Sequence, residues 1–170
     1  AHDAAVRSAL GYLERHALKT RVFDPATKTQ AQTGQQKMVA ALFRHDVSRA
    51  LDPQTHTHAV VANMVEGEDG KWRSVHSPAL FDHKMLGGAI YRAELAANLQ
   101  KLGYAIERTH ADGRFEVAGV PKPLMEAFST RASEIRAALE GRRDTSAEAA
   151  ARAALITRSA KQDIDREDLK

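Results

Sequence analysis

Apolar side chains recur every three to four residues at the start of the chain, which predicts an amphipathic helix over residues 3–19. A second, long helix is predicted to run to Leu102 and to stop at Gly103. Ser77 and Pro78 suit its start, as N-cap and first helical residue. The sequence therefore predicts an amphipathic helix and a second, long helix, with a different pattern between them.

The C-terminal third is predicted to be helical as well. Pro123 begins a helix that Gly141 ends, since apolar residues give this segment one hydrophobic face. Thr145 and Glu148 have the spacing of a capping box before an alanine-rich helix. The charged residues after Lys161 indicate a frayed end or a linker.

The segments between and after the two long helices are typical of strands joined by short turns. Residues 20–33 predict a strand pair, and residues 38–48 form an apolar run that suits a buried strand. A strand over 56–66 follows the turn signal Asp52-Pro53, and Asp69-Gly70 turns the chain into a short return strand, 71–75. A further hairpin is expected over 104–117. This order favours an α+β fold with two layers, an antiparallel sheet with helices packed on it and a helical C-terminal part.

Bulk composition narrows the class of protein. The chain has 170 residues, 43% hydrophobic and 28% charged, which fits one globular domain. It has no cysteine, which excludes disulfides and thiolate metal sites and suits the cytosol. No apolar run approaches the roughly 18 residues of a membrane span. A net charge of +3 permits a polyanionic partner. Because the sequence opens inside a predicted helix without methionine, we expect it to be a piece of a longer protein.

Three histidines form the strongest chemical signal. His56 and His58 are two residues apart on a predicted strand, so they project from the same face. His45 lies on the preceding strand, and antiparallel pairing across the Asp52-Pro53 turn brings it beside them. Three neutral imidazoles form a site for one divalent metal ion with open positions for phosphate oxygens. They leave the full charge of the ion available to stabilise a phosphodiester during cleavage, whether the ion is magnesium, manganese or zinc-like.

The same segment resembles a known family. It reads His45-Asp-Val-Ser-Arg49, then Asp52-Pro-Gln54, then His56-Thr-His-Ala-Val-Val61. These strings are similar to the signature of conjugative relaxases of the TrwC/TraI type, HUH endonucleases that are fused to a DNA helicase. The resemblance covers at least residues 1–140 and continues through Asp69–Ser74, Ile90–Leu95, Leu102–Tyr104, Phe128–Arg131 and Glu134–Arg136.

The resemblance implies a site- and strand-specific endonuclease that acts on single-stranded DNA at a plasmid transfer origin in conjugation. A tyrosine attacks the scissile phosphate and stays joined to the 5′ end, while a metal on His45, His56 and His58 polarises that phosphate. It further implies a bacterial cytoplasmic protein with an N-terminal remainder, a fused C-terminal helicase and relaxosome accessory proteins as partners. Residues 1–142 would be the C-terminal portion of the nicking domain, and residues 143–170 a helical extension or linker.

The catalytic tyrosine is not expected within these residues. In the family it lies near the N-terminus in a cluster of tyrosines, and an acidic residue that orients a histidine also lies upstream of the metal motif. None of Tyr12, Tyr91 and Tyr104 has such a context. The sequence therefore predicts the metal half of a nicking site, inactive by itself.

Candidate DNA contacts are basic residues near the histidine strands. By position Arg49 matches an arginine near the family's site and is a candidate phosphate contact. Lys71, Arg73 and Lys84 are candidates for following the DNA backbone, with solvated surface charge as the alternative. Trp72 could stack on a base or pack on the sheet. The arginines between residues 131 and 152 are expected on solvated helix faces.

Asp52 has two open roles. It could accept a ring N–H from a metal-binding histidine as a second-shell partner, or it could cap a helix or form a turn. Three other functions also remain open: a rolling-circle replication initiator that uses Tyr91 as nucleophile, a metal-dependent hydrolase of small molecules, and a non-catalytic module that binds single-stranded DNA.

Overall fold

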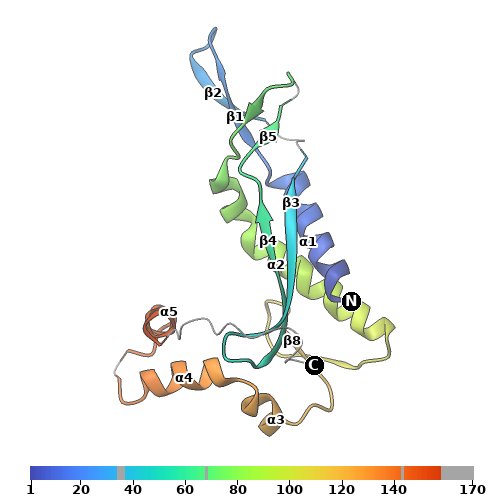
Figure 1. Cartoon of the computed structure of the whole chain (residues 1–170), viewed down its shortest axis with the longest axis vertical. Helices are drawn as coiled ribbons and strands as arrows, with labels where there is room; N and C mark the ends of the chain where they lie inside the picture. Colours follow the sequence, from blue (N-terminus) through green and yellow to red (C-terminus); the bar gives the residue numbers. More distant parts are fainter. Residues whose placement is uncertain (34–36, 68, 143, 158–170) are drawn as a thin grey trace. The chain divides into compact units, whose positions relative to one another are not determined.

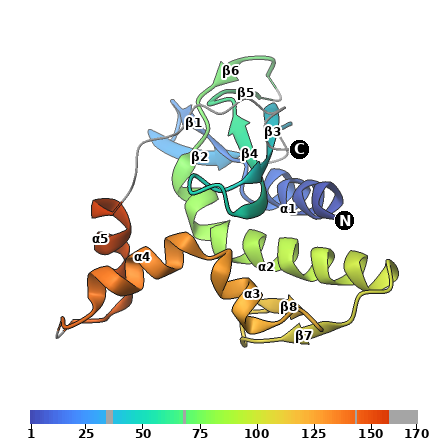
Figure 2. The same ribbon diagram turned by 60° about the horizontal axis from the view of Figure 1, so that its bottom comes forward.

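The computed structural model describes residues 1–33, 37–67, 69–142 and 144–157, and within these the chain divides into two compact units. The first contains residues 1–43 and 57–119, and the second contains residues 44–56 together with residues from 120 onward. Figures 1 and 2 label the elements. The helices are α1 (His2–His16), α2 (Ser77–Lys101), α3 (Lys122–Ala127), α4 (Thr130–Leu139) and α5 (Ala147–Ile156). The strands are β1 (Thr20–Asp24), β2 (Thr29–Thr33), β3 (Ala40–Val47), β4 (Pro53–Val61), β5 (Val65–Glu66), β6 (Trp72–Arg73), β7 (Ile106–Arg108) and β8 (Phe115–Val117).

The first unit is organised around two helices that lie side by side, α1 and α2 (Figures 1 and 2). Gly87, which is buried on α2, lies where the two helices meet. A Cβ at this position would lie 3.5 Å from Cδ2 of Leu13 on α1. Gly87 therefore lies in a packed contact with α1, and α2 continues through Gly87 and Gly88 without a break.

The described strands pair as four antiparallel ladders, β1–β2, β3–β4, β5–β6 and β7–β8. Thr20 of β1 also forms an isolated bridge with Val75, and its hydroxyl donates to the carbonyl of Ser74 at 3.0 Å. Leu18, Val65 and Val75 form a small buried cluster at this junction. The predicted combination of helices with antiparallel strands is confirmed.

The second unit contains the tip of the β3–β4 hairpin, α3, α4 and α5. Arg131 on α4 holds α5 in place, because its guanidinium donates to the carbonyls of Ala154 and Thr157 and to the hydroxyl of Thr157. The same guanidinium lies 2.7 Å from Glu134. Arg131 is therefore a helix-to-helix contact, and the prediction that it lies on a solvated helix face is wrong.

Several predicted boundaries shift. The helix expected from Pro123 to Gly141 is divided into α3 and α4, since Ser129 turns its hydroxyl back to the carbonyl of Met125 and Thr130 begins a new helix. The last helix is capped by Ser146, whose hydroxyl accepts from the backbone of Ala149, in place of Thr145.

Two more shifts concern β4 and α2. The strand predicted over 56–66 begins at Pro53 and ends at Val61, and Val65–Glu66 is a separate strand. His76 precedes α2, so Ser77 is the first helical residue and not the cap. The predicted tail after Lys161 lies outside the described residues. No described helix combines the length and the apolar character that a membrane span requires.

Candidate metal centre

The β3–β4 hairpin positions the three histidines, and its turn is tightly hydrogen-bonded. Ser48 donates its backbone N–H to the carbonyl of Asp52 at 2.8 Å, and its hydroxyl accepts from the N–H groups of Ala50 and Asp52. Leu51 has a φ of 64°, a left-handed conformation that is unusual for a residue with a branched side chain. The chain thus reverses within a few residues, as the Asp52-Pro53 signal predicted.

His45 of β3 and His56 of β4 face each other across this hairpin. Their ring centroids are 5.3 Å apart and their planes are inclined by 35°. His58 follows His56 by two residues on the same strand, and each of the three rings offers a nitrogen within 4.8 Å of the other two. Ring nitrogens grouped in this way could hold one metal ion between them, each as a single ligand. The predicted grouping is what the structure shows.

The tautomer of His56 suits a metal ligand. Its Nδ1 lies 2.9 Å from the backbone carbonyl of Gln54. A carbonyl only accepts, so Nδ1 carries the proton and Nε2 keeps its lone pair. A hydrogen bond of this kind on the far nitrogen is the usual support of a metal-binding histidine. Sequence reasoning missed this support, because a backbone carbonyl leaves no residue signature.

The opposite face of β3 carries an ion pair. Arg44 and Asp46 flank His45 and are joined at 3.1 Å. Because successive side chains alternate in direction along a strand, Asp46 points away from the face that carries His45. Asp46 therefore adds no carboxylate to the three imidazoles.

Asp52 is buried and binds the start of a helix. Its two carboxylate oxygens accept from the backbone N–H of Thr130 at 3.0 Å and from the Thr130 hydroxyl at 2.8 Å, at the first residue of α4. Of the two roles left open by the sequence, these contacts support capping.

The four predicted DNA contacts lie in different settings. Arg49 is exposed in the β3–β4 turn, Lys71 is exposed before β6, and Lys84 is exposed on α2. Arg73 binds both carboxylate oxygens of Asp69, at 2.6 and 2.7 Å. These hydrogen bonds hold the pKa of the Asp69 carboxyl well below its usual range and raise that of the guanidinium. The charge of Arg73 is thus largely neutralised by its neighbour.

The three tyrosines differ in exposure and in the partners of their hydroxyl groups. The Tyr12 hydroxyl lies 2.7 Å from Nδ1 of His83, and Tyr91 lies 2.9 Å from Nδ1 of His2. Burial raises the pKa of the Tyr91 hydroxyl, which keeps it protonated. Tyr104 is exposed. The packed position of Tyr91 gives no support to its use as a nucleophile.

Comparison with known proteins identifies the family. The model of the TrwC relaxase family matches residues 1–170. The chain belongs to the TrwC relaxase family. It is 38% identical over 176 aligned positions to the multifunctional conjugation protein TraI of Escherichia coli, and 37% identical to that of strain K12. Each match covers 98% of this chain but only about 10% of the length of the relative.

Solved structures of this relaxase family share the fold. A metal-free conjugative relaxase TrwC in complex with oriT DNA matches 99% of this chain at 35% identity with a TM-score of 0.88, over 58% of its own length. TrwC bound to a 27-mer with the recognition hairpin and cleavage site matches 99% of this chain at 35% identity with a TM-score of 0.87, over 60% of its own length. A copper-bound structure of TrwC with oriT DNA matches 99% of this chain at 35% identity with a TM-score of 0.87, over 57% of its own length.

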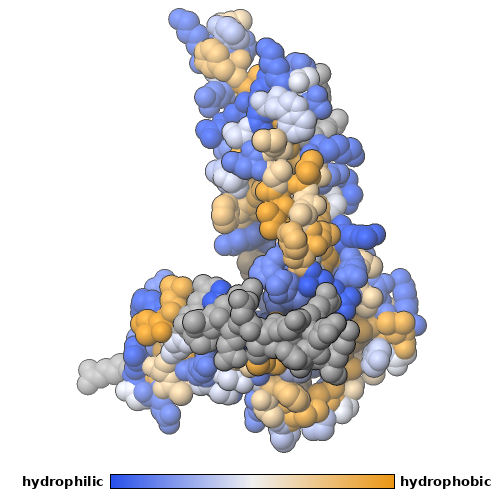
Figure 3. All heavy atoms as spheres, viewed as in Figure 1, coloured by the Kyte–Doolittle hydropathy of each residue, from blue (hydrophilic) through white to orange (hydrophobic). Residues whose placement is uncertain are grey.

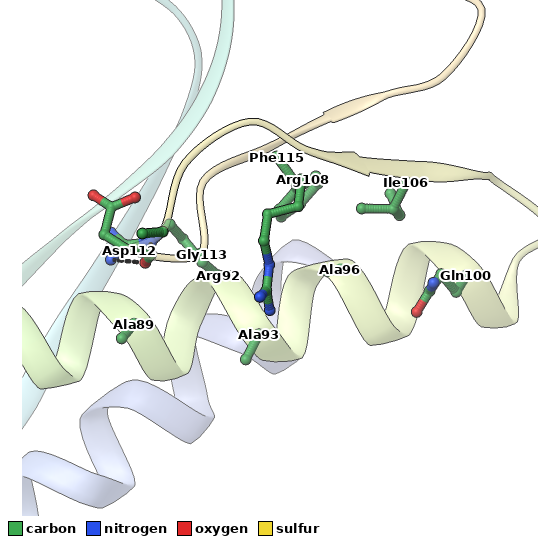
Figure 4. A pocket seen from close by; sticks show the side chains of 11 residues that line it. Ala89, Arg92, Ala93, Ala96, Gln100, Ile106, Arg108, Asp112, Gly113 and Phe115 are labelled. Carbon is green, nitrogen blue, oxygen red and sulfur yellow. Dashed lines mark hydrogen bonds between the residues drawn. The ribbon is translucent and has the colours of Figure 1, made fainter.

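This relaxase chain also has a pocket that the sequence did not suggest. It has a volume of about 430 Å³ and lies in the first unit between α2 and the β7–β8 hairpin (Figure 4). Arg108 extends from β7 toward the alanines of α2, while Gln100 and Phe115 line the same space. Arg92 closes one end by donating to the carbonyl of Asp112 at 2.8 and 3.1 Å.

Proposed function

We propose that this chain is the metal-binding part of a conjugative relaxase that cuts one strand of a plasmid transfer origin. The observation that carries the proposal is the set of three imidazoles on the β3–β4 hairpin, with His56 held in the tautomer that binds metal through Nε2. A divalent ion bound there would act as a Lewis acid toward the scissile phosphate. The solved TrwC structures, bound to oriT DNA with and without metal, support this assignment.

His45, His56 and His58 would each contribute one ring nitrogen. Because neutral imidazoles would leave the charge of a bound ion uncompensated, the ion would supply that charge to a phosphate placed beside it. Arg49, exposed in the turn of the same hairpin, is placed to contact the DNA backbone. We also propose that Lys71 and Lys84 contact the DNA backbone. Arg73 is the weakest of the four candidate DNA contacts, because Asp69 already binds its guanidinium.

The nucleophile would come from a tyrosine outside these residues, in the remainder of the relaxase. The exposed apolar side chains of the first unit support a covering segment. Figure 3 shows hydrophobic side chains gathered over β3 and β4, and Val39, Leu42 and Val60 are each 44–59% exposed. Neighbouring exposed apolar residues of this kind usually mark an interface.

We extend the proposal to the wider assembly. Single-stranded DNA is the substrate, and a helicase domain and relaxosome accessory proteins are the partners, in the cytoplasm of a bacterium. We keep residues 1–142 as the nicking-domain portion and 143–170 as a helical extension or linker. The pocket beside α2 suits one nucleotide of the strand, because it combines a cationic guanidinium, an amide and an aromatic ring.

The test uses the natural protein that carries this chain, Mn²⁺, and a labelled single-stranded oligonucleotide with the nick site. We expect a covalent protein–5′-DNA adduct, lost in His56→Ala and retained in His110→Ala, a control histidine that is exposed on the β7–β8 turn. Arg108→Ala should weaken DNA binding, whereas Lys101→Ala, on α2 but outside the pocket, should weaken it less.

Other outcomes would favour the other functions. An adduct that Tyr91→Phe abolishes even at saturating Mn²⁺ would indicate the replication-initiator mechanism. DNA binding without any metal dependence or adduct would indicate a non-catalytic binding module. Metal-dependent hydrolysis of small phosphoesters, with no adduct, would indicate a hydrolase.

A further inference from the structure

One histidine connects β4 to both long helices of the first unit. Nδ1 of His2, in the first turn of α1, lies 2.9 Å from the hydroxyl of Tyr91 on α2. Nε2 of the same ring lies 2.8 Å from the hydroxyl of Thr57 on β4. Both ring nitrogens are thus used, and side chains from three separate elements form one hydrogen-bonded series.

The ring of His2 is held firmly in this arrangement. It meets the edge of the Tyr91 ring, with centroids 5.7 Å apart and planes inclined by 80°. All three side chains are partly buried, so water competes less for their hydrogen bonds than on an open surface. The helices that carry His2 and Tyr91 pack on each other, which gives the series a rigid base.

Thr57 has a particular place on its strand, because it stands between His56 and His58. Successive side chains of a strand point to opposite faces, so Thr57 leaves the face opposite to the two imidazoles. A hydrogen bond that fixes Thr57 therefore also fixes the rotation of β4 about its own axis at this point. That rotation decides where both neighbouring imidazoles point.

We propose that His2 and Tyr91 are positioning residues of the metal centre, which act through Thr57 to aim His56 and His58. The inference rests on the metal centre of the proposed function. Neither residue touches the metal ligands directly, and sequence spacing gives no indication of their role, since Thr57 and Tyr91 are 55 and 89 positions from His2. The role resembles that of the outer groups that orient metal-binding histidines in other proteins.

The experiment measures the affinity of the natural protein for Mn²⁺ by competition with a fluorescent chelator. Thr57→Val removes the hydroxyl at nearly constant volume, and Tyr91→Phe removes the other end of the series. We expect each to raise the dissociation constant for Mn²⁺ about tenfold, the lower end of what loss of an outer partner produces. Thr57→Ser keeps the hydroxyl and should restore an affinity close to that of the unmodified protein.

Two controls separate positioning from general stability. Thr55→Val changes the same residue type on the same face of β4, on the other side of His56. Thr55 is exposed and makes no side-chain hydrogen bond within the described part of the chain, so this variant should bind Mn²⁺ normally. Leu13→Ala loosens the packing of α1 on α2 beside Gly87 and should lower Tm without changing the affinity of the folded protein.

The result that overturns the inference is an unchanged dissociation constant in both Thr57→Val and Tyr91→Phe. A loss of affinity in Leu13→Ala as large as in Thr57→Val would also overturn it, because stability alone would then explain the effect. Failure of the metal centre itself is distinguishable, since the unmodified protein would then fail to bind Mn²⁺ or His45→Ala would bind it equally well.

Discussion

Replacement of Asp52 tests how the turn of the β3–β4 hairpin is anchored. Asp52 is only 8% exposed and its two oxygens accept from the backbone N–H and the hydroxyl of Thr130. A hydrogen bond to a charged partner contributes about 1.5–3 kcal/mol, and loss of a helix cap typically costs about 1 kcal/mol. Because Thr130 is exposed, water can replace part of what is lost, and we expect Asp52→Ala to lower the free energy of unfolding by about 2 kcal/mol.

Two companion variants divide this effect. Asp52→Asn keeps one acceptor oxygen and should lose about 1 kcal/mol, and Thr130→Val removes only the hydroxyl and should also lose about 1 kcal/mol. The double variant Asp52→Ala with Thr130→Val should lose less stability than the sum of the losses in the two single variants, because each single variant already removes the hydrogen bond that the two residues share. Urea unfolding followed by circular dichroism at 222 nm is the assay, since it reports the loss of the helices, α4 and α5 among them.

Two results would refute the reasoning. Asp52→Ala with a stability within 0.5 kcal/mol of the unmodified chain, below the roughly 1 kcal/mol of an ordinary cap, would show that the contact to Thr130 contributes little. An Mn²⁺ affinity lowered tenfold or more by Asp52→Asn but unchanged by Thr130→Val would show that Asp52 acts on a histidine, since loss of an outer partner of a metal ligand weakens binding 10–100-fold.

The remaining predictions concern stability. Gly87→Ala should raise the free energy of unfolding by up to about 1 kcal/mol, because its Cβ meets Leu13 at an ordinary 3.5 Å and alanine favours helix, whereas Gly87→Leu should lower Tm through overpacking. Arg131→Met should lower the stability of the α4–α5 pair by about 1–3 kcal/mol in urea unfolding, since it loses hydrogen bonds to α5 carbonyls. Asp69→Asn should lower Tm near neutral pH and not in acid. The pKa of Asp69 is held below its usual 3.8, so its contribution is present above that value and is lost as the pH falls toward the folded pKa, which Tm measured from pH 7 to pH 2 would show.

Local patterns predicted most of the elements and the grouping of the three histidines. A helix period, a two-residue alternation and a turn signal each act over a few residues, so α1, α2 and the β3–β4 hairpin could be predicted from the sequence. His45, His56 and His58 could be grouped because only one short turn separates them. The same signals give boundaries poorly, as the shift from Thr145 to Ser146 as the cap of α5 shows.

Contacts between distant segments could not be predicted. The separation of α3 from α4 coincides with the contact between Asp52 and Thr130, which are 78 positions apart. Arg131 was expected in solvent. It pairs with Glu134 on its own helix, but its other partners, Ala154 and Thr157, lie in and just after α5. Long-range pairing of this kind depends on how elements pack, and no periodicity in one segment records it.

The two faces of β4 show why a strand suits this chemistry. Imidazole ligands must stay clear of competing hydrogen bonds on the side that binds metal, yet each needs a fixed direction. Alternation serves both requirements, since Thr57 is bound by His2 on one face while His56 and His58 project from the other. The carbonyl of Gln54 adds a second constraint from the backbone of the same strand. Precision in such a site therefore comes from residues that never meet the metal, and it should be lost first when they are replaced.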